Sequence, residues 1–188
     1  MSRSRAGILS GASASILKFG TRKTTMGDIA RVGGVAKATL YNHFRDKREL
    51  YAALVDAEVD ALIVRVAAAY TSGVSSDPVT NALTAAALGV AGHPLLRHIA
   101  GHEPVVLGSV ICFGDRPAWL KARRQAAGLF GSTEPSAAGD LALRWVVSHA
   151  GWPAVEADVA AAAAVVAAAG RVLAAPPDEP VDQFAARL

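Results

Sequence analysis

The sequence predicts an all-α protein, and three observations carry that prediction. Hydrophobic residues make up 52% of the 188 residues, enough to bury a core, while aromatic residues contribute only 6%. Alanine, the strongest helix former, supplies the largest share of the hydrophobic residues. Apolar positions recur three and four residues apart, and Gly, Pro and Asp punctuate the segments between them.

Charge is distributed unevenly along the chain. Residues 1–51 carry ten Lys or Arg against three acidic residues, a net charge of +7. The remaining residues carry nine against thirteen, a net charge of −4. A merely solvated face usually mixes both signs. The basic N-terminal part therefore indicates a polyanionic partner, with nucleic acid favoured over a membrane surface.

Two helices are predicted before residue 35. The first spans residues 3–19 with an apolar stripe, and Gly20 stands where a C-terminal cap belongs. Thr25 and Asp28 have the spacing of a capping box, which predicts that a second, short helix begins there. The Gly33-Gly34 pair breaks that helix and predicts a tight turn.

A third helix is predicted over residues 36–44, where polar and cationic residues crowd together. At 100° per residue its inner face holds Ala36, Leu40, His43 and Phe44. Ala38 and Asn42 fall at the centre of the opposite, outer face. A fourth helix opens with a second box, Asp46 to Glu49, and continues to about residue 69.

Three helices with a glycine turn between the second and third predict a helix-turn-helix. The outer face of the third helix suits the major groove, because Asn42 can bond an adenine edge and the Ala38 methyl can contact a thymine methyl. The surrounding phosphate contacts are predicted to be Thr25, Lys37, Tyr41 and Lys47.

The stretch from Thr24 to Val55, TTMGDIARVGGVAKATLYNHFRDKRELYAALV, resembles the DNA-binding region of TetR (tetracycline-repressor) family transcriptional regulators. The matching positions are Thr24-Thr25, Asp28-Ile29-Ala30, Gly34-Val35, Thr39-Leu40-Tyr41, His43-Phe44 and Lys47. The resemblance covers about the first fifty-five residues. It implies a homodimer whose helical C-terminal domain binds a small molecule, and a repressor that leaves DNA when this effector binds.

The resemblance also implies roles for single residues. Thr25, Tyr41 and Lys47 match phosphate-contacting positions, and the recognition helix contributes Lys37, Ala38, Thr39, Asn42 and His43. Two positions depart from the family pattern. Ala36 replaces a frequent Ser, so the third helix lacks a side-chain N-cap, a loss of about 1 kcal/mol. Ala38 replaces a frequent Gly, which bears on the base that is read.

The rest of the chain predicts further helices. Their expected ranges are 77–92, 94–100, 115–130, 136–149 and 154–174, with helix favoured for the apolar run 105–113. We expect a helix-turn-helix domain over residues 1–50, joined by the long fourth helix to a helical ligand-binding and dimerisation domain over residues 51–175. Residues 176–188 are expected to form a loose tail.

The last helix is apolar around most of its circumference and must be buried on more than one side. Packing on a second copy across a two-fold axis is favoured over a central helix in a monomer. The predicted dimer residues are Trp145, Trp152, Val159, Ala162, Val166 and Leu173.

Candidates for an apolar effector pocket are Phe113, Trp119, Arg123 and Trp145, each of which could also be plain core. His98 and His102, four residues apart, have a spacing that zinc sites use, but polar or pocket-lining histidines are favoured. Cys112 is expected to be a small buried residue rather than a redox sensor.

The sequence contains no nucleophile triad, phosphate loop or dinucleotide motif, so neither an enzyme nor a cofactor is predicted. The N-terminus lacks a signal-peptide pattern, and the most apolar run, residues 159–170, is shorter than a membrane span. We expect a cytoplasmic protein with three partners: operator DNA, a second copy and a largely apolar effector. The alternative is a helical carrier of apolar small molecules whose basic N-terminal part is incidental.

Overall fold

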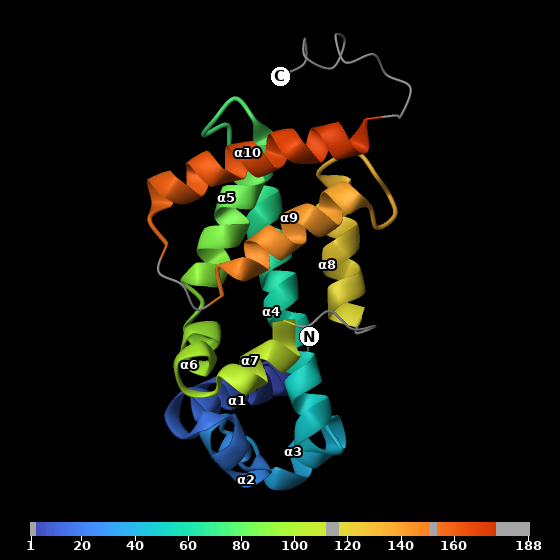
Figure 1. The fold of residues 1–188 in the computed structure, drawn as a ribbon. Helices are drawn as coiled ribbons and strands as arrows, with labels where there is room; N and C mark the ends of the chain where they lie inside the picture. Colours follow the sequence, from blue (N-terminus) through green and yellow to red (C-terminus); the bar gives the residue numbers. More distant parts are fainter. Residues whose placement is uncertain (1–2, 112–116, 151–153, 176–188) are drawn as a thin grey trace. The chain divides into compact units, whose positions relative to one another are not determined.

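The computed structural model describes residues 3–111, 117–150 and 154–175, and within these ranges it contains ten helices and no strand. The all-α prediction is confirmed. The helices are α1 (Arg3–Lys23), α2 (Met26–Val32), α3 (Lys37–His43), α4 (Lys47–Tyr70), α5 (Pro78–Ala91), α6 (Pro94–His102), α7 (Pro104–Ile111), α8 (Pro117–Gly128), α9 (Ala137–Ser148) and α10 (Glu156–Ala174) (Figure 1).

Several helices begin where the predicted N-cap residues and prolines placed their starts. Thr25, Asp77 and Ser136 are N-caps whose side chains accept hydrogen bonds from backbone N–H groups of α2, α5 and α9. Pro94 is the first residue of α6, as expected. These signals succeed because a cap involves only residues within one turn. The apolar run after residue 104 is the helix α7 as far as Ile111.

The described residues fall into two compact units. The first comprises those of Met1–Asp60 and His93–Cys112, and the second those of Ala61–Gly92 and Phe113–Leu188. Helix α4 contributes its beginning to the first unit and its end to the second. Helices α6 and α7 thus group with the N-terminal helices, although they lie in the middle of the sequence.

In the first unit, α1 packs against α2, α3 and α6, and α6 packs against α7. Figure 1 shows α6 and α7 on one side of α1 and the α2–α3 pair on the other. The core of this unit is fully or almost fully buried and comprises Ile8, Ile16, Ile29, Leu40, Phe44 and Leu50.

In the second unit, α9 packs against α5, α8 and α10, and α10 also packs along α5. Small side chains fill these contacts, and Ala82, Ala87, Ala142, Ala163 and Ala167 have no exposed surface. Two ion pairs join helices: Arg123 of α8 with Asp140 of α9, at 2.8 Å, and Arg171 of α10 with Asp77, at 2.5 Å.

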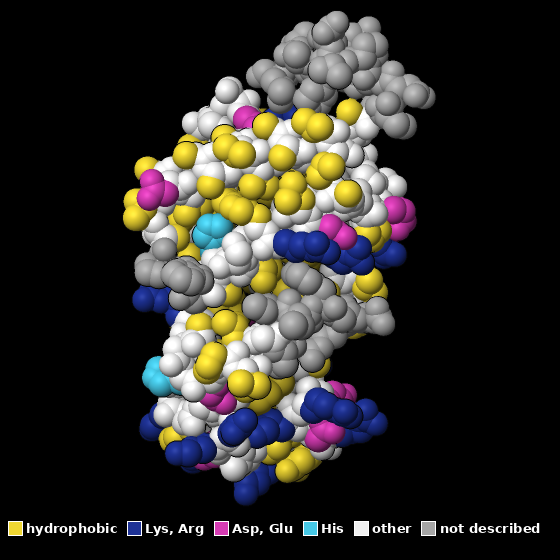
Figure 2. All heavy atoms as spheres, viewed as in Figure 1, with side chains coloured by type: hydrophobic (Ala, Val, Ile, Leu, Met, Phe, Trp, Pro, Cys, Tyr) yellow, Lys and Arg dark blue, Asp and Glu magenta, His cyan; other side chains and the backbone are white. Residues whose placement is uncertain are grey.

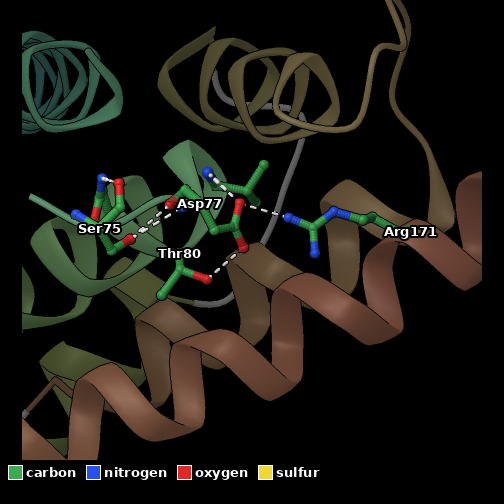
Figure 3. Close-up of polar contacts among 6 residues, drawn as sticks. Ser75, Asp77, Thr80 and Arg171 are labelled. Atoms are coloured by element: carbon green, nitrogen blue, oxygen red, sulfur yellow. Dashed lines mark hydrogen bonds and ion pairs between the residues drawn. The ribbon is translucent and has the colours of Figure 1, made fainter. Parts of the chain in front are cut away.

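Asp77 serves two helices at once (Figure 3). Its carboxylate accepts from the backbone N–H of Val79 at 3.1 Å and from the Thr80 hydroxyl at 2.6 Å, which caps α5, and it also accepts from Arg171 of α10. Burial raises the pKa of Asp77, but the hydrogen bonds from Thr80 and Arg171 outweigh it and leave the pKa below its usual value.

Helix α10 is 19 residues long and, by length and composition alone, is apolar enough to cross a membrane. A core helix of a soluble protein passes the same test. Here one side of α10 is buried against α5 and α9, through Val159, Ala163, Ala167 and Gly170.

Candidate nucleic-acid interface

The capping box predicted at the start of α2 is present. The Thr25 hydroxyl accepts from the Asp28 N–H at 3.1 Å and donates to the Asp28 carboxylate at 2.6 Å, which also accepts from the Thr25 N–H. Arg31 pairs with the same carboxylate at 3.1 Å. The hydrogen bonds from Thr25 and then Arg31 lower the pKa of Asp28, so the box stays charged. The start of α2 is therefore held in place, with Thr25 exposed.

The turn between α2 and α3 lies directly against the backbone of α1. A Cβ atom added at Gly11 would lie 2.6 Å from the Gly33 nitrogen, and one added at Gly33 would lie 2.8 Å from the Gly7 carbonyl oxygen. Gly34 adopts a φ of +64°, which an L side chain rarely takes. Sequence reasoning found the glycine turn but missed Gly7 and Gly11. Their spacing of four residues on one helix face is the signal that could have revealed them.

Helix α3 presents the face that was predicted. Leu40 and Phe44 are buried, and the Arg5 guanidinium lies 4.9 Å from the Phe44 ring centre. The exposed side chains are Lys37, Ala38, Tyr41 and Asn42, while Thr39 and His43 are half-buried. We call the four exposed residues the α3 outer face; His43, predicted for the inner face, is half-buried. Ala36 makes no side-chain cap, as expected, but it is exposed rather than part of the inner face.

Lys47, predicted to contact phosphate, also has partners within its own unit. Its ammonium donates to the carbonyl oxygens of Thr21, Arg22 and Thr24, at 3.1, 3.2 and 3.1 Å. An ammonium has three N–H donors, so all of them are engaged. Lys47 therefore ties the start of α4 to the end of α1, and its neighbour Arg48 carries the exposed charge.

The end of α1 is held from a second direction. Gly20, with a φ of +81°, interrupts α1, so the Thr21 N–H loses its partner within the helix. Glu103, between α6 and α7, accepts from this N–H at 2.6 Å and also from the Thr21 hydroxyl. Burial raises the pKa of Glu103, but the two hydrogen bonds from Thr21 lower it below its usual value. Tyr51 of α4 donates to the Thr21 carbonyl at 3.1 Å.

Sequence reasoning missed this network, which we call the α1–α2 corner. It comprises Gly20, Thr21, Thr24, Lys47, Tyr51 and Glu103. The corner leads directly into Thr25, so contacts from α4 and from the α6–α7 connection determine where the helix-turn-helix begins. No local signal marks it, because its members are far apart in the sequence.

The four predicted pocket residues have different surroundings. Phe113 lies outside the described residues. Trp119 is buried within the second unit, and Trp145 is half-buried with its ring edge-on to His149 at 4.7 Å. Arg123 forms two hydrogen bonds of 2.8 Å with Asp140, so its charge is already balanced. The Asp140 contact also raises the pKa of Arg123.

The predicted dimer residues differ in exposure. Val159 is buried within its own unit, Ala162 and Val166 are half-buried, and Leu173 is 52% exposed. Trp152 lies outside the described residues. The helix face that α10 leaves uncovered carries Val165 and Val172 instead. In Figure 2 hydrophobic side chains gather over α9 and α10.

Comparison with known proteins also points to a helix-turn-helix in the N-terminal region. Residues 8–54 match the model for bacterial regulatory proteins of the tetR family. The HTH-type transcriptional regulator TtgR of Pseudomonas putida is 42% identical over 53 residues. That alignment covers 28% of this chain and 25% of the length of TtgR, so the likeness to this relative is confined to the N-terminal region.

Two solved structures extend the likeness beyond the N-terminal region. A TetR family transcription regulator from Marinobacter aquaeolei VT8 has a TM-score of 0.60 at 17% identity, covering 88% of this chain and 94% of its own. AibR, solved in complex with isovaleryl coenzyme A and operator DNA, has a TM-score of 0.55 at 20% identity, covering 88% and 96%. At these identities the likeness establishes the fold. Residues 8–54 therefore match the tetR family of bacterial regulatory proteins, and the chain shares the fold of the solved regulators.

Proposed function

We propose that this protein is a ligand-responsive transcriptional repressor that binds palindromic operator DNA as a homodimer. The observation that carries the proposal is the α3 outer face, where Ala38 and Asn42 are exposed beside Lys37 and Tyr41. A short exposed helix with a small residue and an amide at its centre fits a major groove, and its cationic neighbours suit the phosphate backbone.

The direct test is a gel shift at low salt, followed by selection of bound fragments from a random DNA pool. We expect an inverted repeat whose half-sites are about 34–36 Å apart, one helical turn of DNA, because each copy supplies one α3. Binding of a monomer at full affinity to a single half-site would contradict the homodimer. Absence of any DNA binding at low salt would favour a carrier of apolar ligands.

Dimerisation is proposed to use the uncovered side of α9 and α10. Val165, Val172 and Leu173 of α10 are each more than half exposed, and Leu141 of α9 is 37% exposed. Leaving such a face in water is unfavourable, and an apolar, alanine-rich surface allows two helix pairs to approach closely. This interface replaces the stripe through Val159, because Val159 already packs inside its own unit.

A matched pair of substitutions tests this interface. Val165 on α10 and Val64 on α4 are both 68% exposed, so Val165→Glu and Val64→Glu add the same charge to equally accessible positions. Sedimentation at equilibrium should show a dimer for the parent and for Val64→Glu, and a monomer for Val165→Glu. A dimer that survives Val165→Glu would exclude this face. Association with lipid vesicles in place of dimerisation would assign α10 to a membrane surface.

The effector is proposed to be a largely apolar small molecule bound in the second unit. AibR, of similar fold, was solved with both an acyl coenzyme A and operator DNA, so this fold is compatible with both partners. An effector lowers operator affinity only by binding the DNA-incompetent state more tightly, with a coupling typically of about 1–3 kcal/mol.

Helix α4 is proposed to transmit this coupling. It has 24 residues and is therefore about 36 Å long, and it begins at Lys47 in the α1–α2 corner. Titration of effector with and without operator tests the mechanism, since linkage requires operator to weaken the effector by the same factor. Equal affinities would exclude it, and an effector-induced monomer would replace it with loss of dimerisation.

A further inference from the structure

The first unit contains a groove that the proposed function does not use. It lies between the end of α1 and the connection from α6 to α7, and has a volume of about 610 Å³. The walls that matter here are formed by Lys18, Phe19, Arg22, His98, His102 and Val105. The α2–α3 pair lies on the other side of α1 (Figure 1).

One part of the groove is cationic. Lys18, Arg22 and Lys23 are exposed, and none of them forms an ion pair with a carboxylate in the described parts of the chain. The single acidic side chain in the wall is Glu103, whose carboxylate already accepts two hydrogen bonds from Thr21. Three cations against one carboxylate, whose charge acts on Arg22, leave the groove with a net positive charge.

The other part of the groove is apolar. Val105, the second residue of α7, is 80% exposed, and Phe19 contributes a half-buried ring. The Lys18 ammonium lies 5.2 Å from the centre of this ring. Phosphates of DNA would satisfy the cations but leave these apolar side chains in water. A ligand with both an anionic group and an apolar group satisfies both.

The two histidines of the groove offer a hydrogen-bonding group to a ligand rather than a metal site. The rings of His98 and His102 stack at 4.6 Å, and the His102 Nδ1 donates to the His98 carbonyl at 2.9 Å, which leaves Nε2 of His102 for another partner. Among the described residues, no group of three or more His, Cys, Asp or Glu side chains is placed to hold a metal ion.

We propose that this groove binds a small amphipathic anion, with its carboxylate or phosphate held by Arg22 and Lys18 and its apolar part lying on Phe19 and Val105. The proposal concerns binding only and does not depend on whether the protein binds DNA. Two forces are required together: charge-assisted hydrogen bonds to the anionic group, and burial of apolar surface on the side that is now exposed.

Three probes separate these forces in the full-length protein. Octanoate carries an anionic carboxylate and an apolar alkyl chain. Octanol carries only the alkyl chain, and acetate has the carboxylate with almost no apolar part. Because the second unit can also bind an apolar molecule, the readout must be specific to the groove. We therefore choose the imidazole NMR signals of His98 and His102, assigned with His98→Gln and His102→Gln. Octanoate should shift both signals at saturation, and acetate and octanol should need at least about tenfold higher concentrations.

Substitutions then locate the site. Arg22→Gln removes the anion contact and leaves the backbone carbonyl that Lys47 uses, so octanoate affinity should fall about tenfold. Val105→Asp places a negative charge next to the alkyl chain of octanoate and should abolish the octanoate-induced shifts of the histidine signals. Arg97→Gln, an exposed cation on α6 that does not line the groove, should leave octanoate binding unchanged. Far-UV circular dichroism checks that each variant folds.

Several outcomes would overturn the proposal. Equal affinity for acetate and octanoate would reduce the groove to an unspecific anion contact. Octanoate binding that is unaffected by both Arg22→Gln and Val105→Asp would place the ligand elsewhere. If Arg22→Gln leaves octanoate binding intact but weakens binding to random duplex DNA and lowers its salt dependence, the cations are DNA phosphate contacts instead.

Discussion

The two units of this protein are held together in different ways. In the first unit, glycine backbones touch and a polar network at the α1–α2 corner joins α1, α4 and the α6–α7 connection through hydrogen bonds to backbone groups. In the second unit, alanine side chains fill most of the helix contacts, Gly139 of α9 lies against the backbone of α8, and two part-exposed ion pairs join helix surfaces. The network of long-range hydrogen bonds to backbone groups is therefore the feature that distinguishes the unit with the helix-turn-helix.

The largest expected effect is on the glycine contact. Gly11→Ala should destabilise the first unit by about 2–3 kcal/mol, because the new Cβ would lie 2.6 Å from a backbone nitrogen that cannot move aside. Gly101→Ala is the matched control, since Gly101 is also helical and nothing lies within 4 Å of its Cβ position. The control should be stabilised by about 0.5–1 kcal/mol. Urea unfolding measures both, and equal behaviour of the two variants would contradict the glycine contact.

The next effect concerns Lys47. Lys47→Met should lower the free energy of unfolding by about 2 kcal/mol, because three carbonyl oxygens lose a charged donor. Arg48→Met, the same change at the exposed neighbouring position, should alter stability by less than about 0.5 kcal/mol. Thermal unfolding distinguishes the two variants. Unchanged stability of Lys47→Met, with a salt slope of DNA binding reduced by about 1, would support the prediction that Lys47 contacts a phosphate instead.

Asn42→Ala tests the face that the first unit presents. It should cost about 1–3 kcal/mol of binding free energy on the selected operator and little on random DNA, because Asn42 is expected to face base edges. Stability should be unaffected, since the side chain is exposed. Fluorescence anisotropy with both duplexes provides the comparison. An equal loss on random DNA would mean that Asn42 contacts the backbone and that α3 is rotated relative to the groove.

The smallest effect is expected for the ion pair of the second unit. Arg171→Met should lower stability at pH 7 by about 0.5–1 kcal/mol, because both partners are part-exposed and screened by solvent. Arg124→Met is the control: its charge lies 4.0 Å from Glu134, both side chains are more exposed, and no loss is expected.

The pH dependence of Arg171→Met has a definite sign. The pKa of Asp77 in the folded state lies below 3.8, so the carboxylate stabilises the fold above that pH and stops doing so as the pH falls through the folded pKa. The difference between parent and Arg171→Met should therefore be constant near neutrality and shrink below about pH 3.8. A difference that persists at acidic pH would assign the loss to packing of the arginine stem.

The sequence by itself determined the features that depend on neighbouring residues. The capping box at Thr25, the glycine turn, the N-cap at Asp77 and the outward direction of Asn42 all follow from rules that act within one or two helical turns. They were predicted correctly because no distant part of the chain competes for the same groups. The all-α fold class could be predicted for the same reason, because helix propensity and the spacing of apolar residues are also local properties.

Tertiary structure alone decided the features that join distant residues. The Thr21 and Glu103 partners are 82 residues apart, and Lys47 reaches back 23 to 26 residues to its carbonyls, so no spacing in the sequence reveals them. In α10 the reason is different. Alanine and valine occupy most positions around the circumference of α10, so every face is almost equally apolar. The spacing of apolar residues therefore cannot identify the face that is buried. Packing against α5 and α9 buries the face of Val159 and leaves Val165 exposed, and this choice depends on where the neighbouring helices lie.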